Sequence, residues 1–246
     1  MKKLLAITAL SAALFFGQTA AAEEKAAEEV KPSHVEMVLV LDESGSMSDL
    51  TRDTIGGFNS MIEKEKKLDV DAHVTTVLFN DQYKMLYNRR ELKDVRKMTD
   101  KDYTPGGMTA LLDAVGRTIH KMDMVSGIHR KDKGNKVLFV IITDGEENDS
   151  KEYTYADVKK LIKDRQENAG WEFIFLGANI DAAAAAENLG IDRDRAVKYK
   201  NTGSGVRANF KAVAELSDSL AKSGRVSDEW KETVEKDEDD AADKQS

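Results

Sequence analysis

Two apolar runs constrain this chain more than any other feature of its sequence. Residues 35–41 and 137–143 are rich in valine, leucine and isoleucine, and each run ends at or next to an aspartate, Asp42 and Asp144. A short apolar run without alternation is typical of a strand that is covered on both faces, as in a parallel sheet. The sequence therefore predicts two central, buried strands, each followed by a carboxylate.

The rest of the chain alternates between the patterns of strands and helices. Further strands are expected at 74–79, 83–87, 173–176 and 197–199, and helices at 49–67, 111–122, about 158–169, 182–186 and 206–223. A turn signal before 83–87 favours an antiparallel edge strand there. The predicted fold class is α/β: a Rossmann-like, open, mostly parallel, doubly wound sheet with one antiparallel edge strand and helices on both faces.

Polar oxygen ligands gather where the predicted strands end. Ser44 and Ser46 follow Asp42 within one Gly-containing turn, and Thr109 follows a Gly-Gly pair at the start of a predicted helix. Parallel strands place their carboxyl ends on one edge of the sheet, so Asp42 and Asp144 are expected on the same rim. Hydroxyls and carboxylates without nitrogen or sulfur are the ligand set of a hard divalent cation.

These three segments together resemble the von Willebrand factor type A (VWA) domain and its metal-ion-dependent adhesion site (MIDAS). The family pattern is Asp-x-Ser-x-Ser, then Thr, then Asp, and it matches Asp42, Ser44, Ser46, Thr109 and Asp144 in that order. The resemblance covers residues 34–224. It implies that the two serines bind the metal directly, that the two aspartates act mainly through water or by orienting the hydroxyls, and that the threonine binds directly or through water.

The expected cofactor is a divalent cation, with Mg²⁺ favoured over Mn²⁺ or Ca²⁺ because few direct ligands would be charged. An ion held mainly by neutral hydroxyls keeps much of its charge, so a protein partner's Asp or Glu carboxylate could complete its coordination. The residues expected to form a partner-binding rim around the ion are Glu43, Gly107, Met108, Glu146 and Glu147.

The two ends of the chain differ in character from its centre. Residues 1–22 have a positive start, a short apolar core and an Ala-rich site, which predict a signal peptide cleaved near Ala22 and hence a periplasmic or secreted protein. Residues 23–33 are expected to be a polar spacer, and residues 225–246 an acidic, disordered tail. No second apolar stretch in the sequence is long enough to suggest a transmembrane segment in the mature chain.

Composition argues against two kinds of site. The net charge of the chain is -8, which does not favour nucleic-acid binding because phosphate contacts need clustered Lys and Arg. The four histidines, at positions 34, 73, 120 and 129, show no spacing typical of metal ligands, so zinc is not expected.

The sequence thus favours a metal-dependent protein–protein interaction module, an adhesion or adaptor domain without catalytic activity. Two alternatives stay open: a Mg²⁺-dependent phosphatase or hydrolase that uses Asp42, and a secreted surface or matrix adhesin. A phosphatase of the haloacid dehalogenase type usually has a second aspartate where this chain has Ser44. The identity of the partner and the oligomeric state are not determined by the sequence.

Overall fold

A six-stranded sheet forms the centre of the computed structural model, which describes residues 34–68, 71–124 and 135–242, the last six of these by their backbone alone. The predicted signal peptide and spacer lie outside the described residues. The strands are β1 (His34–Asp42), β2 (Ala72–Phe79), β3 (Tyr83–Glu91), β4 (Asn135–Thr143), β5 (Glu172–Gly177) and β6 (Ala196–Lys198).

The order of the strands across the sheet is β3-β2-β1-β4-β5-β6. All neighbours are parallel except β3, which pairs with β2 in the antiparallel direction at one edge. The two apolar runs predicted to be central are adjacent: β1 pairs with β4, with Leu41 opposite Ile142. The predicted fold class is therefore confirmed, including its antiparallel edge strand.

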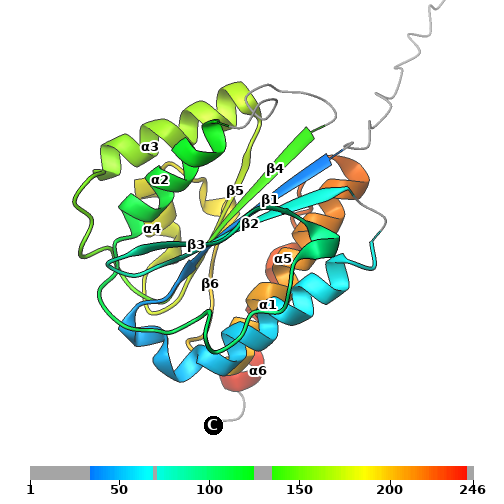
Figure 1. Ribbon diagram of the computed structural model, residues 1–246. Coiled ribbons are helices and arrows are strands. Elements are labelled where there is room, and N and C mark those ends of the chain that lie inside the picture. The colour runs from blue at the N-terminus through cyan, green and yellow to red at the C-terminus, as the bar shows by residue number, and fades with distance from the viewer. Residues whose placement is uncertain (1–33, 69–70, 125–134, 243–246) are drawn as a thin grey trace, which may run out of the picture.

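Helices cover both faces of this sheet (Figure 1). One face carries α2, α3 and α4, and the other carries α1, α5 and α6. Their bounds are α1 (Thr51–Glu65), α2 (Leu111–Asp123), α3 (Tyr155–Asp164), α4 (Ala182–Leu189), α5 (Gly203–Ser223) and α6 (Trp230–Ala242).

The packing of β1 explains why its sequence does not alternate between apolar and polar residues. Val35, Met37, Leu39 and Leu41 pack in the core beneath α1 and α5, whereas Val38 and Val40 pack against the opposite layer. Because both faces are buried, an apolar side chain is favourable at nearly every position. The parallel strands β1 and β4 finish at the same end of the sheet. This end lies at the lower left of Figure 1, where the chain passes from β1 towards α1.

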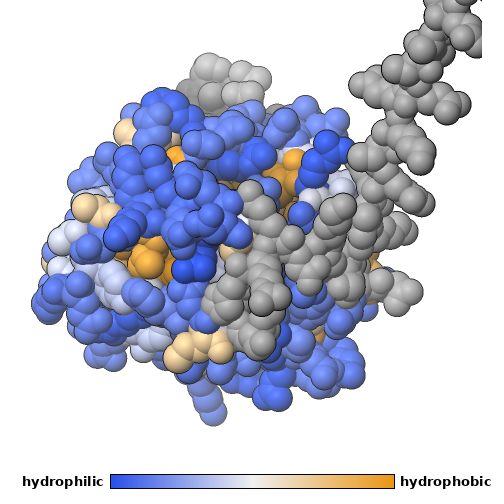
Figure 2. All heavy atoms as spheres, turned by 90° about the horizontal axis from the view of Figure 1, so that it is seen from above, coloured by the Kyte–Doolittle hydropathy of each residue, from blue (hydrophilic) through white to orange (hydrophobic). Residues whose placement is uncertain are grey.

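The opposite end of the sheet, where β1 and β4 begin, lies at the upper right of Figure 1 and is turned towards the viewer in Figure 2. Its coloured surface is mostly hydrophilic, with small apolar areas between the polar side chains. Among the described residues, no helix combines the length and the apolar character needed to cross a membrane.

The C-terminal segment differs from the disordered tail that was expected at 225–246. Helix α6 begins at Trp230, and the side chains of Trp230 and Val234 join the core beneath α5 with exposed fractions of 2% and 1%. Two apolar side chains four residues apart share one face of a helix, so a mostly acidic segment can still dock. The expectation of disorder is wrong for Trp230–Ala242, because these two anchors outweigh the acidic composition of the helix.

We expect Trp230→Ala to destabilise the protein by about 3–5 kcal/mol, because it removes a large side chain from the core and leaves a cavity. The free energy of unfolding, measured by urea denaturation, checks this. Glu229→Ala changes the exposed preceding residue and should shift it by less than about 0.5 kcal/mol. Equal stabilities of the two variants would mean that α6 does not dock.

A buried carboxyl lies between α1 and α5. Glu65 is 2% exposed, its Oε2 accepts a hydrogen bond of 2.6 Å from Ser217 Oγ, and its Oε1 is buried without a hydrogen-bond partner among the described residues. Burial raises the pKa of Glu65 from 4.5 to about 7, although the hydrogen bond from Ser217 opposes the rise. The folded protein therefore binds this proton more tightly than the unfolded chain does.

Because its folded pKa is raised, Glu65 favours the folded state most below pH 4.5, and this advantage is lost as the pH rises through about 7. A shift of this size corresponds to roughly 3 kcal/mol. We expect Glu65→Gln to leave stability at pH 4.5 nearly unchanged and to raise it at pH 8, by up to that amount. Urea denaturation at both pH values tests this, with exposed Glu63→Gln as the matched control.

Candidate metal centre

Asp42, at the end of β1, is held by hydrogen bonds to both of its carboxylate oxygens. Its Oδ1 accepts a bond of 2.7 Å from the Ser44 backbone N–H, and its Oδ2 accepts one of 2.6 Å from Thr143 Oγ1 at the end of β4. Only 1% of the residue is exposed. Burial raises the pKa of the Asp42 carboxyl, whereas the hydrogen bonds from Ser44 and Thr143 favour its charged form.

The two serines of the first loop meet the second aspartate directly. Ser44 Oγ and Ser46 Oγ lie 3.1 Å apart, and Ser46 Oγ donates a hydrogen bond of 2.5 Å to Asp144 Oδ1. Residues 98 positions apart in the chain therefore share one cluster, as the strand-end argument predicted.

Thr109 reaches the same rim on a separate loop. Its backbone N–H donates to Asn148 Oδ1 at 2.9 Å, and its carbonyl accepts bonds from the backbone N–H groups of Asn148 and Asp149. Its Oγ1 lies beside Gly145, close enough that a Cβ built there would be 3.8 Å away. The threonine hydroxyl is thus adjacent to the residue that follows Asp144.

Backbone contacts lock the first loop to the Gly-Gly loop that carries Thr109. Gly45 N–H donates to the Gly107 carbonyl at 3.2 Å, and Gly106 N–H donates to the Glu43 carbonyl at 2.9 Å. Gly107 has a φ of 77°, and a Cβ there would lie 1.9 Å from Asp81 Oδ1. Only glycine suits this position, since it needs both a left-handed backbone and the missing side chain.

The donor set and its spacing fit a small divalent cation. Adjacent oxygens around an octahedral Mg²⁺ are about 2.9 Å apart for metal–oxygen distances of about 2.0–2.1 Å. The two serine oxygens, at 3.1 Å, are close to that spacing without rearrangement. All five residues predicted as metal ligands or their supports, namely Asp42, Ser44, Ser46, Thr109 and Asp144, lie on this one rim.

Four further residues support the rim and were not singled out from the sequence. The Thr143 hydroxyl donates to the Asp42 carboxylate, and the Tyr103 hydroxyl donates to the Asp42 carbonyl. The Asn201 side-chain amide lies 3.3 Å from Asp144 Oδ2, and that of Asn179 lies 3.3 Å from the Asp144 carbonyl. Asn179 and Asn201 follow β5 and β6, so polar residues after every parallel strand were the signal that could have found them.

Two residues expected on the partner-binding rim are occupied within the protein instead. Glu43 is 4% exposed and accepts hydrogen bonds from the Thr104 backbone and, at 3.1 Å, from Lys84 Nζ. Glu147 accepts bonds from Leu112 N–H at the start of α2 and from Ser150. Their partner-binding role is not supported, because buried or fully bonded carboxylates serve here to hold loops.

Three of the expected rim residues do face outward. Met108 is 51% exposed, and Gly107 and Glu146 are also exposed on the loops around the site. Ser46 is exposed as well, so the hydroxyl cluster is open to solvent on the side of these residues. The exposed surface of these loops therefore carries one large apolar side chain, Met108, and one carboxylate, Glu146.

Comparison with known proteins agrees with this fold. Residues 34–191 match the family described as vWA-TerF-like, "vWA found in TerF C terminus". The chain belongs to this family. The matched part runs from the start of β1 to the second residue after α4, and the vWA sheet and its covering helices continue beyond it into β6 and α5. No curated protein matches the chain.

Solved structures show the same vWA fold at low sequence identity. The vWF domain of the type V pili tip protein Mfa5 from Porphyromonas gingivalis is 13% identical, with a TM-score of 0.53, over 81% of this chain and 99% of that one. Proximal thread matrix protein 1 from the mussel byssus, in a form with a zinc-occupied MIDAS motif, is 12% identical, with a TM-score of 0.53, over 77% of this chain and 46% of that one. The chain thus spans about half the length of the mussel protein.

A mutant of the PilB minor pilin from Streptococcus sanguinis is also similar. It is 13% identical, with a TM-score of 0.54, over 76% of this chain and 62% of that one. At such identities the likeness establishes the fold of this vWA chain.

We expect Ser46→Ala to weaken Mg²⁺ binding at least about tenfold, because it removes a hydroxyl from the cluster while leaving the buried Asp42 network intact. Isothermal titration calorimetry with Mg²⁺ and Mn²⁺ measures this. Ser60→Ala, which changes an exposed serine on α1, is the matched control and should bind as the wild type does. Unchanged affinity in Ser46→Ala would remove the assignment of this rim.

Proposed function

We propose that this vWA domain holds Mg²⁺ on its rim and uses the ion to capture a carboxylate of a partner protein. The observation that carries the proposal is the pair of serine hydroxyls 3.1 Å apart, with Ser46 also bonded to Asp144. Ser44, Ser46 and Thr109 would bind the ion, while Asp42 and Asp144 would orient these hydroxyls and supply nearby negative charge.

Charge balance supports capture over a closed structural site. Both oxygens of Asp42 already accept hydrogen bonds within the protein, and those of Asp144 face Ser46 and Asn201. With neutral hydroxyls as its direct ligands, a bound Mg²⁺ would keep most of its charge. A carboxylate from another molecule is then a favourable additional ligand.

The surroundings of the rim suit a protein as the partner. Exposed Met108, next to Thr109 in the chain, offers an apolar contact, and exposed Glu146, two residues after Asp144, offers a negatively charged group. A central ion-mediated contact with an apolar neighbour and a polar edge has the composition of a small interface.

A phosphatase that uses Asp42 as nucleophile is less well supported. The carboxylate is 1% exposed, and each of its oxygens accepts a short hydrogen bond from the protein. A nucleophile needs an oxygen that can approach the substrate, so this environment suits a supporting residue better.

The location proposed for the protein is outside the cytoplasm, as the predicted signal peptide implies. The similar Mfa5 and PilB structures are a pilus tip protein and a minor pilin, which is consistent with a place at the cell surface. Within this proposal the chain acts as an adaptor in the periplasm or as a secreted adhesin, two roles that cell fractionation separates.

The test is selection of a displayed peptide library on the purified chain in Mg²⁺, followed by elution with a chelator. We expect the eluted peptides to share an Asp or Glu. Replacing that residue by Asn or Gln should lower affinity more than about tenfold, because one neutral oxygen replaces the charged ligand. Ser46→Ala should lose the same peptides, and Ser60→Ala should retain them.

Peptides that bind equally well in chelator, or that share no carboxylate, would contradict carboxylate capture. An assay of phosphate ester hydrolysis in Mg²⁺ addresses the alternative directly. Turnover that Asp42→Asn abolishes would replace the binding proposal by an enzymatic one.

A further inference from the structure

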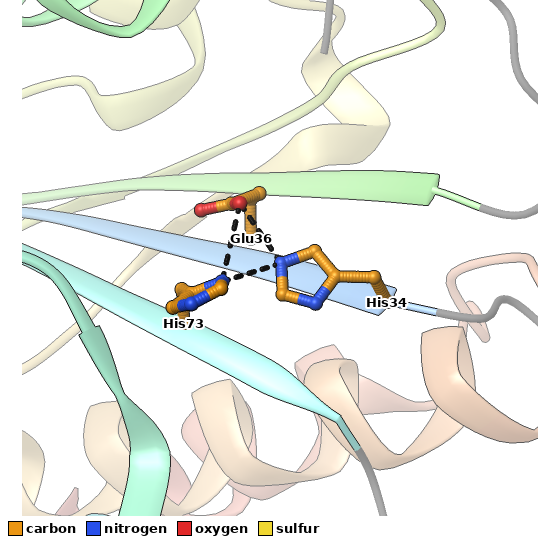
Figure 3. Close-up of side chains that lie close together, drawn as sticks. All are labelled: His34, Glu36 and His73. Atoms are coloured by element: carbon orange, nitrogen blue, oxygen red, sulfur yellow. Dashed lines mark hydrogen bonds and ion pairs between the residues drawn. The ribbon is translucent and has the colours of Figure 1, made fainter. Parts of the chain in front are cut away.

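A second cluster of side chains that could bind a metal lies at the opposite end of the sheet from the rim, where β1 and β2 begin (Figure 3). His34 and Glu36 come from β1 and His73 from β2, and Glu36 and His73 are directly paired in the register of these strands. His34 Nε2 lies 2.8 Å from Glu36 Oε1 and 2.9 Å from His73 Nδ1, and the latter atom lies 3.5 Å from the same Glu36 oxygen.

These distances define a small triangle of two imidazole nitrogens and one carboxylate oxygen. For a tetrahedral Zn²⁺ with metal–ligand distances of about 2.0–2.1 Å, neighbouring ligand atoms are about 3.3 Å apart. The observed spacings differ from that value by a few tenths of an ångström. The three side chains could therefore share one ion after small adjustments.

An acidic neighbour orients His34 in the way that metal-binding histidines are commonly oriented. Its other ring nitrogen, Nδ1, lies 3.2 Å from Asp71 Oδ2. Without an ion, His34 Nε2–H donates to Glu36 Oε1. When an ion displaces that proton, a proton kept on Nδ1 and bonded to Asp71 would leave the Nε2 lone pair free to bind the metal. A carboxylate behind a histidine also makes the imidazole a better ligand.

Glu36 has unused capacity to bind a cation. It is 1% exposed, and its Oε2 is buried without a hydrogen-bond partner among the described residues. A buried carboxylate oxygen left without a partner is costly, and a metal ion that both oxygens can reach would satisfy it.

Arg89 of β3 brings a positive charge to two of the three ligating side chains, Glu36 and His73. Its Nε lies 3.0 Å from Glu36 Oε1, its Nη2 also bonds that oxygen, and Nη2 lies 3.4 Å from His73 Nδ1. A bulge in the pairing of β2 with β3 lies next to Arg89, whose φ is 47°. The arginine side chain is 31% exposed, so it can leave towards solvent when another cation binds.

We propose that His34, Glu36 and His73 form a Zn²⁺ site, separate from the rim, in which Arg89 supplies the positive charge when zinc is absent. Two imidazoles and one carboxylate are a common ligand set for zinc, whereas the oxygen-only rim suits Mg²⁺. The ion would link the start of β1 to the start of β2 and thereby stabilise that end of the sheet.

Local spacing could not reveal this site, and the expectation that the histidines bind no zinc rested on spacing alone. His34 and His73 are 39 residues apart, and only the parallel pairing of β1 with β2 places them on one face. His120, by contrast, lies on α2 with Tyr153 as its neighbour and takes no part in the cluster.

The test is calorimetric titration of the full chain with Zn²⁺ in saturating Mg²⁺, on the Ser46→Ala background so that the rim does not contribute. We expect one zinc per chain. His73→Gln should lower its affinity at least 100-fold, and Asp71→Asn should lower it about 10- to 100-fold, as for loss of a residue that orients a ligand. Arg89→Ala should bind zinc more tightly, since the competing cation is gone.

Exposed His120→Gln is the matched control and should bind zinc as its parent does. Far-UV circular dichroism of the metal-free variants confirms that they fold, and Co²⁺ in place of Zn²⁺ should give the intense visible absorption of a tetrahedral site, lost in His73→Gln. Zinc affinity that is absent, or unaffected by His73→Gln in folded protein, overturns the proposal. Since the rim is disabled throughout, neither result depends on the proposed capture of carboxylates.

Discussion

The carboxylate of Asp42 is the interaction on which the rim depends. It joins the end of β1 to the end of β4 through Thr143, and it holds the Ser44 backbone in the turn that follows. Together with the backbone bonds between the first loop and the Gly-Gly loop, these two bonds place Ser44 and Ser46 beside Asp144. Because the carboxylate is 1% exposed, its hydrogen bonds compete little with water, and the turn is strongly constrained.

The two ends of the sheet, where the parallel strands finish and where they begin, offer different ligand atoms to cations. At the carboxyl ends of the strands, loops present hydroxyls and carboxylates, and the polar backbone of those loops is locked by bonds such as Gly45 to Gly107. At the opposite end, side chains of the strands themselves, His34 and His73, present nitrogen. A parallel sheet separates its two ends by the length of its strands, so the two clusters lie far apart and ions proposed for them would not compete for the same ligands.

Much of the fold and the five rim residues could be predicted because their signals are local. An apolar run that ends in Asp identifies both a buried strand and a strand end, and the parallel arrangement then places all such ends together. Predictions from the sequence were wrong where the tertiary contacts of a few residues outweigh the character of the neighbouring sequence. Trp230 and Val234 dock a segment whose composition is acidic, and Glu43 and Glu147 hold loops although their sequence neighbours suggested an open rim.

The sequence by itself determined the succession of strands and helices along the chain as far as α5, and the five polar residues of the rim, because periodicity and strand ends depend on neighbouring residues. Tertiary structure alone decided which carboxylates near the rim stay exposed and which are bonded within the protein, since that depends on donors from distant loops such as Thr104 and Leu112. It also decided that His34 and His73 meet. Pairing between strands creates that proximity, and no spacing along one strand encodes it.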